Sequence, residues 1–265
     1  MRIEYKKDRY ARDTLERYTG SSVEEFGSQV ILVNFPAYVE HFASVRNAEI
    51  KSGYWSAAHD RHHDVSIINF GVGSPSAGII THCLSFLEHV ACVLMVGMCG
   101  GIDDALNIGD IVIPTASVRD EGTSRHYLPQ DVPALPSFAV NRISERVIIS
   151  TTGKNPKSGI MMTTDYRMWE FDEEFVDYIL KHRIIAVDME IATIFSVAYA
   201  LNLPVGAIML VSDLPLQTGG IKNKDSAREV FAAYTREHIT LALEVMEEVK
   251  KHRDTLQSCR TKCEW

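Results

Sequence analysis

The sequence predicts an α/β protein of three αβα layers, in which a central mixed sheet carries helices on both faces. Two observations support this class. Apolar β-branched runs alternate along the chain with segments whose apolar residues have helical spacing. The runs are almost continuously apolar, which is typical of strands buried on both faces of a sheet. A chain of 265 residues can enclose one large core, and no linker or repeat interrupts the pattern, so we expect a single domain over residues 1–265.

Strands are expected where Val, Ile and Leu cluster between turn residues. Their ranges are 29–35, 65–70, 91–96, 109–118, 158–163, 184–187 and 204–211. Because strands and helical segments alternate, consecutive strands are expected to share one sheet with the helices packed over it.

Helices are expected between and after these strands. Residues 9–19 form a short polar helix that Gly20 ends, and an amphipathic segment follows the Gly-rich stretch 71–78 to about His89. A long helix is expected over 225–251, where charged and apolar residues recur at helical spacing. The preceding "TGGIKNKD", 218–225, is expected to be a mobile lid, and the last residues, 254–265, are expected to fray.

The composition excludes several classes of function. A net charge of −8 argues against a nucleic-acid-binding surface, which needs a basic stripe. The N-terminal "MRIEYKKDRYARD" lacks the apolar core of a signal peptide, and the longest apolar stretch, 91–98, is too short to cross a membrane. We therefore expect no nucleic-acid partner, no membrane association and a cytoplasmic location.

The cysteines indicate the same compartment. Cys83, Cys92 and Cys99 lie in apolar segments and are expected to be packed thiols. Cys259 and Cys263 lie in a polar tail without a second pair of ligands nearby, so we interpret them as free thiols instead of a metal clip. This usage is typical of the reducing cytoplasm.

Two motifs resemble known ligand-binding motifs, but each lacks a feature that such a site requires. "GVGSPS", 71–76, follows a strand and opens a helix like a dinucleotide fingerprint, but its third position is Ser76, and the next strand ends in Gly97 where the fingerprint needs an acid. "HDRHHD", 59–64, has metal-binding residue types, but successive residues cannot all point one way, and a polar loop before a strand also explains it. We expect neither a dinucleotide cofactor nor a metal.

Two apolar runs contain carboxylates where each run ends. They are "AVDMEIATIF", 186–195, and "IMLVSD", 208–213. Burying an ionised carboxylate without partners costs several kcal/mol. Each carboxylate could cap a helix or pair with a basic residue, and the alternative is that both belong to one site.

Polar or Gly-rich segments at strand ends favour a common site. They are 71–76, 97–101, 188–190 and 212–213. In open α/β sheets ligands bind at strand ends, and Gly-rich turns let a ligand approach backbone N–H groups. One carboxylate can accept from both hydroxyls of a vicinal diol, and a second can protonate a leaving group. The pattern predicts a site for a small polyhydroxyl ligand with one protonatable atom.

Several motifs resemble, in order and spacing, those of the purine nucleoside phosphorylase/nucleosidase superfamily. They are "VGMCGGIDDALNIGDIVIP", "AVDMEIATIF" and "LVSDLP". A closer resemblance, to the AMP nucleosidase family, comes through "ERYTG", "ILVNFPAYVEHF", "TTDYRMWE" and "EHITLALEVM". The resemblance covers residues 15–249 and implies a nucleoside phosphorylase-like fold in a compact catalytic form, without the extra N-terminal domain of the long AMP nucleosidases.

The resemblance also assigns roles to residues of these motifs. Glu190 would grip the ribose 2′- and 3′-hydroxyls, and Asp213 would donate a proton to purine N7. Met189 would pack on the sugar, and Ser212 would orient Asp213. The residues implied to bind the substrate besides the two catalytic carboxylates are Asp188, Met189, Ser212, Gly100, Arg167 and Trp169.

The implied reaction is hydrolysis of the N-glycosidic bond of AMP, which gives adenine and ribose 5-phosphate through an oxocarbenium-like transition state. Phosphorylases of the superfamily hold inorganic phosphate with two arginines, and Tyr38 and Met95 stand at those positions here. Losing two cations weakens the binding of a dianion, so water is the expected nucleophile. Glu40 is a candidate for the base that orients the water. Met98 stands where related nucleosidases carry a basic residue.

The 5′-phosphate of AMP needs cations. The candidates are Arg119, Arg125, Arg167 and Lys222, although a surface salt bridge explains each arginine taken singly. The resemblance implies no cofactor. It implies a nucleotide substrate and a homohexamer, because members of the superfamily commonly complete their active sites across subunit interfaces.

Two rival functions stay open. One is a phosphorylase for purine nucleosides or uridine, because "VRDEGTSRHYLP", 118–129, resembles uridine phosphorylases. The other is a nucleotide-binding regulator without turnover, against which the presence of both Asp213 and Glu190 argues.

Overall fold

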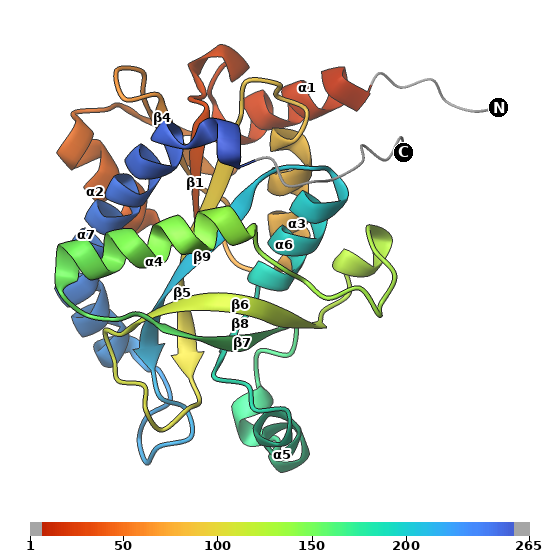
Figure 1. Cartoon of the computed structure of the whole chain (residues 1–265), viewed down its shortest axis with the longest axis vertical. Helices are drawn as coiled ribbons and strands as arrows, with labels where there is room; N and C mark the ends of the chain where they lie inside the picture. The colour runs from red at the N-terminus through yellow and green to blue at the C-terminus, as the bar shows by residue number, and fades with distance from the viewer. Residues whose placement is uncertain (1–6, 257–265) are drawn as a thin grey trace.

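A computed structural model of the chain describes residues 7–256 and places a mixed sheet at the centre of the molecule (Figure 1). The strands within this range are β1 (Gln29–Val33), β2 (Ile50–Ser52), β3 (Ser56–Asp60), β4 (Val65–Asn69), β5 (Cys92–Gly101), β6 (Ile111–Asp120), β7 (Lys157–Thr164), β8 (Ala186–Asp188) and β9 (Val205–Asp213). Their order is β2-β3-β4-β1-β5-β8-β7-β6-β9, and β5 also pairs with β9.

The second half of the sheet closes on itself. β5 pairs with β9, β9 with β6, β6 with β7, β7 with β8, and β8 returns to the end of β5. The β5–β9, β6–β7 and β7–β8 pairs are parallel, whereas β6–β9 and β5–β8 are antiparallel. The sequence predicted the mixed sheet but not this closure, because closure depends on pairings between strands far apart in the chain.

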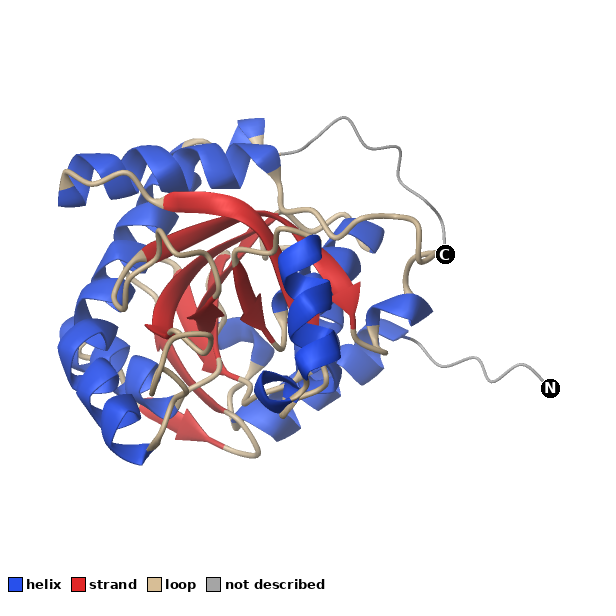
Figure 2. Ribbon diagram, turned by 90° about the horizontal axis from the view of Figure 1, so that it is seen from below, coloured by secondary structure: helices blue, strands red, loops and turns tan. Residues whose placement is uncertain are grey.

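The helices cover both faces of the sheet, as predicted (Figure 2). They are α1 (Lys7–Thr19), α2 (Pro36–Arg46), α3 (Ser74–Leu84), α4 (Phe138–Thr152), α5 (Glu173–Lys181), α6 (Ile191–Ala200) and α7 (Lys224–Lys251). One apolar cluster joins the sheet to α1, α3 and α6, and a second joins it to α2, α4 and α7. Strand β1 alternates between them, with Val30 and Leu32 in the first cluster and Ile31 and Val33 in the second.

Most expected elements are present with shifted ends. The helix expected at 9–19 begins at Lys7, and the segment expected to reach His89 ends as a helix at Leu84. Residues 97–101, expected as a Gly-rich turn, continue strand β5 instead. Their glycines fit a crowded strand, because a Cβ on Gly97 would lie 2.7 Å from Cε of Met95.

Other features of the chain bear on the remaining expectations. Helices α2, α4, α5 and α6 and strands β2 and β3 were not expected. Residues 218–223 form the loop that leads into α7. Within the described range no helix is both long and apolar enough to cross a membrane. Cys83, Cys92 and Cys99 are buried free thiols, as predicted, whereas Cys259 and Cys263 lie outside the described residues.

Candidate active site

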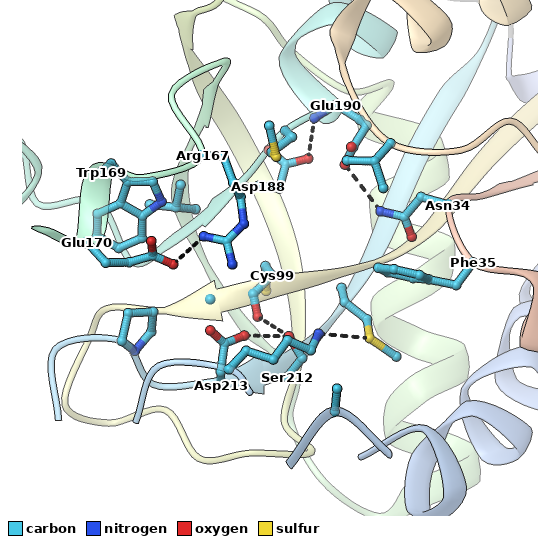
Figure 3. A pocket seen from close by; sticks show the side chains of 18 of the residues that line it. Asn34, Phe35, Cys99, Arg167, Trp169, Glu170, Asp188, Glu190, Ser212 and Asp213 are labelled. Atoms are coloured by element: carbon cyan, nitrogen blue, oxygen red, sulfur yellow. Dashed lines mark hydrogen bonds and ion pairs between the residues drawn. The ribbon is translucent and has the colours of Figure 1, made fainter. Parts of the chain in front are cut away.

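A cavity of about 370 Å³ opens where several strands end (Figure 3). Its walls come from the ends of β1, β5, β8 and β9, from the turn after β7 and from the start of α7. The lining residues are Asn34, Phe35, Val72, Met98, Cys99, Gly100, Arg167, Trp169, Glu170, Val187, Asp188, Met189, Glu190, Ser212, Asp213, Pro215, Lys222, Ala227 and Phe231. The cavity therefore gathers eight of the residues that the resemblance assigned to catalysis or substrate binding, together with Lys222.

Gly100 brings the two carboxylate motifs together. In the sheet it lies opposite Asp213 of β9 on one side and opposite Val187 of β8 on the other. A Cβ on Gly100 would lie 3.0 Å from Pro215 and 3.7 Å from Oδ2 of Asp213. A side chain here would crowd Pro215 and contact the Asp213 carboxyl, so glycine keeps the floor of the cavity open.

Glu190 lies at the start of α6 with its side chain buried against the cavity. Its Oε1 accepts from the backbone N–H of Gly73 at 2.7 Å, and its Oε2 accepts from Nδ2 of Asn34 at 3.3 Å. Gly73 has φ of 107°, a conformation that favours glycine. Burial, and then the charge of Asp188, raises the pKa of Glu190 above its ordinary value.

Asp188 is also buried, but its carboxylate is used inside the protein. Oδ1 accepts from the Thr163 hydroxyl at 2.6 Å, and Oδ2 accepts from the backbone N–H groups of Glu190 and Ile191 at 3.0 and 2.8 Å. Asp188 therefore satisfies the first N–H groups of α6 in the manner of a helix cap. The sequence predicted a substrate-binding residue; Asp188 does line the cavity, but its hydrogen bonds are made to the protein.

Asp213, at the end of β9, lies at the other end of the cavity from Glu190 (Figure 3). Oδ1 is 2.6 Å from Oγ of Ser212, and the same Oγ lies 3.2 Å from the carbonyl oxygen of Cys99. Burial raises the pKa of the Asp213 carboxyl, while the Ser212 hydrogen bond and the nearby Lys222 charge act in the opposite direction. Asp213 therefore holds a proton more readily than an exposed aspartate does.

Lys222 reaches the cavity from the loop before α7. Its Nζ lies 3.6 Å from Sδ of Met98 and over the rings of Phe35 and Phe231, at 5.6 and 5.7 Å from their centres. Burial lowers the pKa of Lys222, and the charge of Asp213 opposes this effect. Lys222 therefore places a cation beside Asp213, and it contacts the methionine that stands where a basic residue was expected.

The turn after β7 forms part of the cavity wall. Nη1 of Arg167 forms an ion pair with Oε1 of Glu170 at 2.6 Å. Trp169 is buried in a small apolar cluster with Met162 and Val187. Arg167 and Trp169 were expected near the substrate and both line the cavity. Glu170 was not expected.

Asn34 is a second residue that the sequence reasoning missed. It follows directly after β1, so the rule that polar residues at strand ends form sites could have found it. Its Oδ1 is buried and has no hydrogen-bond partner among the described residues. Glu170 lies in a short 3-10 turn, Trp169–Phe171, and carries no comparable signal in the sequence.

Arg119 and Arg125, which were expected to hold the 5′-phosphate, do not line this cavity. The Arg119 guanidinium is buried and donates to Oγ of Ser124 and to the carbonyl oxygens of Leu128, Pro129 and Val132, at 2.6–2.9 Å. It therefore holds the 124–132 segment in place. Arg125 is exposed on that segment.

The two positions where phosphorylases carry arginines lie in the core. Tyr38 is fully buried, and its hydroxyl lies 2.8 Å from Nδ1 of His238, whose Nε2 donates to the carbonyl oxygen of Ile208 at 3.2 Å. Met95 is fully buried in the apolar cluster under α3 and α6. Neither lines the cavity, nor does Glu40, which is exposed on α2.

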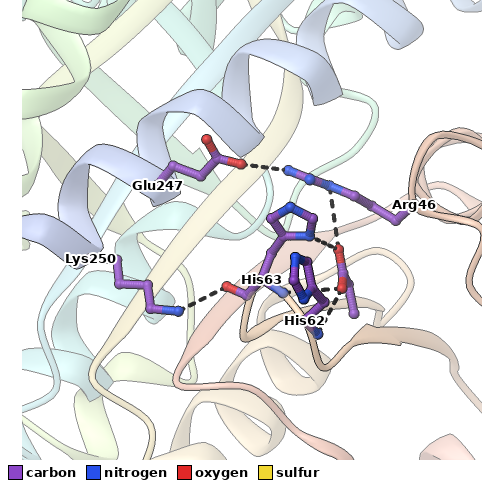
Figure 4. A network of polar contacts seen from close by, with 6 residues as sticks. Arg46, His62, His63, Glu247 and Lys250 are labelled. Carbon is purple, nitrogen blue, oxygen red and sulfur yellow. Dashed lines mark hydrogen bonds and ion pairs between the residues drawn. The ribbon is translucent and has the colours of Figure 1, made fainter.

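Side chains of the His-rich segment 59–64 form hydrogen bonds and ion pairs within the protein. Oδ1 of Asp60 accepts from the backbone N–H groups of His62 and His63, and Oδ2 lies 2.6 Å from Nδ1 of His63 and 3.6 Å from Nε of Arg46 (Figure 4). Arg46 also pairs with Glu247 of α7. This network joins the β3–β4 turn to α2 and α7, and no group of three metal-ligating residues occurs in residues 7–256.

The chain is similar to known proteins of one superfamily. Residues 23–247 match the model of the phosphorylase superfamily. AMP nucleosidase of Escherichia coli strain K12 is 28% identical over 291 aligned residues, which cover 92% of this chain and 59% of the relative. This chain thus spans about three fifths of the length of that relative.

Two further proteins are similar to this chain. The crystal structure of AMP nucleosidase from Bacteroides thetaiotaomicron VPI-5482 superposes with a TM-score of 0.82 at 32% identity, covering 94% of this chain and 99% of that one. Guanosine phosphorylase of Halorubrum lacusprofundi is 31% identical over 167 residues, which cover 63% of this chain and 68% of the relative. The chain belongs to the phosphorylase superfamily.

Proposed function

We propose that this cavity hydrolyses the N-glycosidic bond of AMP to adenine and ribose 5-phosphate. The observation that carries the proposal is the placement of two buried carboxyl groups, Glu190 and Asp213, at opposite ends of one cavity. The similarity to two AMP nucleosidases, one of which matches over nearly its whole length, supports the same substrate.

The two carboxyl groups have complementary roles in this proposal. Glu190 binds the ribose diol, because its two oxygens can accept from both hydroxyls while Gly73 and Asn34 hold it in place. In its ionised form, Glu190 favours the positive charge that develops on the sugar. Met189 packs on the sugar, while Trp169 and Gly100 line the base site.

The leaving base departs with the help of Asp213. As the bond from C1′ to N9 breaks, its electron pair passes to the purine and the Asp213 proton passes to N7. Ser212 keeps the carboxyl oriented through the 2.6 Å contact to Oδ1. Lys222, for which we expected a phosphate contact, stabilises instead the carboxylate that remains after the transfer, because its charge acts mainly on Asp213.

Water is the proposed nucleophile. An inorganic phosphate dianion normally needs several charge-assisted contacts. The positions that provide arginines in phosphorylases are Tyr38 and Met95, and both side chains are packed in the core. The water oxygen bonds to C1′ and its proton leaves to a base that we do not assign.

The 5′-phosphate argues for more than one subunit. Among the described residues the cations that line the cavity are Arg167 and Lys222, and the charges of both act on Asp213, at the end where the base would lie. The ribose end therefore lacks a cation of its own within residues 7–256. We infer that the chain acts as one catalytic domain in a homo-oligomer, which we take to be a cytoplasmic homohexamer, in which a neighbouring copy supplies this charge.

The test incubates AMP and adenosine without phosphate and identifies the sugar product. We expect AMP to give ribose 5-phosphate and adenosine to react much more slowly. Cleavage of AMP that needs added phosphate and yields ribose 1,5-bisphosphate would identify a phosphorylase instead. Light scattering of the same preparation measures the oligomeric state, and an active monomer would contradict the shared site.

A further inference from the structure

Glu170 has a carboxylate oxygen whose hydrogen-bonding capacity is unused. Its side chain is 4% exposed, and Oε1 is held by Arg167 at 2.6 Å. Oε2 is buried and has no hydrogen-bond partner among residues 7–256. A buried carboxylate oxygen without a donor is costly, so a residue that keeps one in the wall of a ligand cavity indicates a donor on the ligand.

The position of Glu170 identifies which part of the ligand it meets. Glu170 and Arg167 line the same cavity as Asp213, and the charges of both act on the Asp213 carboxyl, with opposite signs. In a purine, N7 and the substituent on C6 are neighbours on one edge of the ring. If Asp213 faces N7, a group on the adjoining wall meets the C6 substituent (Figure 3).

We propose that Glu170 is a specificity-determining residue that accepts a hydrogen bond from the 6-amino group of adenine. This inference rests on the proposed function, because it takes the orientation of the base from the role of Asp213. Oε2 is buried beside the cavity, and a small rotation about the last side-chain torsion, which is broad in glutamate, would turn it toward the base while Oε1 stays within reach of Arg167.

The Arg167 contact strengthens the discrimination. A 6-amino group can donate a hydrogen bond to the Glu170 carboxylate. A 6-oxo group is an acceptor, so it would place two acceptors against each other. The 2.6 Å ion pair directs Nη1 of Arg167 to Glu170, which keeps that donor from the 6-oxo position. The site thus disfavours hypoxanthine and guanine nucleotides because it presents an unpaired acceptor to their 6-oxo group.

The experiment compares kcat/KM for AMP, IMP and purine riboside 5′-monophosphate, which has no 6-substituent, in wild type and Glu170→Gln. A glutamine amide keeps the shape and can turn its donor to a 6-oxo group, so we expect the AMP-to-IMP ratio to fall by roughly 10- to 10²-fold, the size of one charge-assisted hydrogen bond. The matched control is Glu173→Gln, an exposed glutamate at the start of α5, which should leave the ratio unchanged.

Equal losses on all three substrates in Glu170→Gln would assign Glu170 a structural role and overturn the inference. If the variant does not fold, wild type alone decides, because similar kcat/KM values for AMP and purine riboside 5′-monophosphate would overturn it as well. Calorimetric binding of adenine and hypoxanthine separates the two proposals, since it needs no turnover. A wild type that prefers adenine but does not cleave AMP would contradict the proposed function, and loss of that preference in Glu170→Gln would still support base recognition by Glu170.

Discussion

The backbone N–H of Glu190 donates a 3.0 Å hydrogen bond to Oδ2 of Asp188. The Asp188 carboxylate therefore helps to hold Glu190 in place. Asp188 receives three hydrogen bonds from the protein, whereas Glu190 receives two and faces the cavity. The ionised form of Asp188 is the better stabilised of the two, and its charge disfavours ionisation of Glu190.

This arrangement predicts that Glu190 reduces stability at high pH. Because its pKa is raised by folding, the native state retains a proton that the unfolded chain has already lost, and stability falls as pH rises from the ordinary glutamate pKa through the raised one. Glu190→Gln removes this effect, so its Tm relative to wild type should increase between about pH 5 and about pH 9. Thermal unfolding measures the difference, with exposed Glu174→Gln as the control. A difference that does not change with pH would contradict the prediction.

The same variant tests the diol contact. Glu190→Gln keeps the shape of the side chain but weakens the hydrogen bonds that we propose it makes to two ribose hydroxyls. Each charged hydrogen bond contributes about 1.5–3 kcal/mol, so kcat/KM for AMP should fall by roughly 10²-fold or more, and 2′-deoxy-AMP, which has lost one of these bonds already, should lose less. Steady-state rates on both substrates measure this. Equal losses would mean that Glu190 is structural.

Asp213→Asn should lower kcat by roughly 10²–10⁴-fold with little change in substrate binding, because an amide cannot supply the proton for N7. In the proposed mechanism the protonated acid is the active form, and burial raises the pKa of Asp213. Turnover should therefore fall as pH rises through that pKa, and the variant should lose this dependence. Exposed Asp177→Asn on α5 serves as the control. Near-normal turnover in folded Asp213→Asn would remove Asp213 from the mechanism.

Tyr38→Phe should reduce stability and leave catalysis unchanged. The variant removes the hydroxyl that lies 2.8 Å from Nδ1 of His238 and leaves a buried ring nitrogen without a partner. The expected loss is about 1–3 kcal/mol of unfolding free energy in urea. Tyr54→Phe, at a ring that is 81% exposed, is the control. A large loss of turnover at unchanged stability would place Tyr38 in the catalytic site and reopen the choice between water and phosphate.

Local patterns predicted much of the fold and part of the site. The alternating and continuous apolar runs predicted the positions of most strands, because a strand buried on both faces of a sheet is almost continuously apolar in sequence. Helix α2 left little trace, since its apolar residues are spread around the helix. Residues 97–101 were expected as a turn because glycine is common in turns. In the closed half of the sheet, however, Gly97 lies within a strand, because the side chains of Met95 and Met209 leave no room for a Cβ there.

The sequence by itself determined that carboxylates would stand at the ends of β8 and β9 and that neither Tyr38 nor Met95 could supply a cation. Only the tertiary structure decided which carboxylate faces the cavity. Glu190 is held by Gly73 and Asn34, which lie 117 and 156 positions away in the chain, while Asp188 is held by Thr163 and by the start of its own helix. A charged residue in an apolar run indicates that the charge needs hydrogen-bond partners. Because hydrogen bonds act over only about 3 Å, the identity of those partners depends on which distant segments the fold brings together.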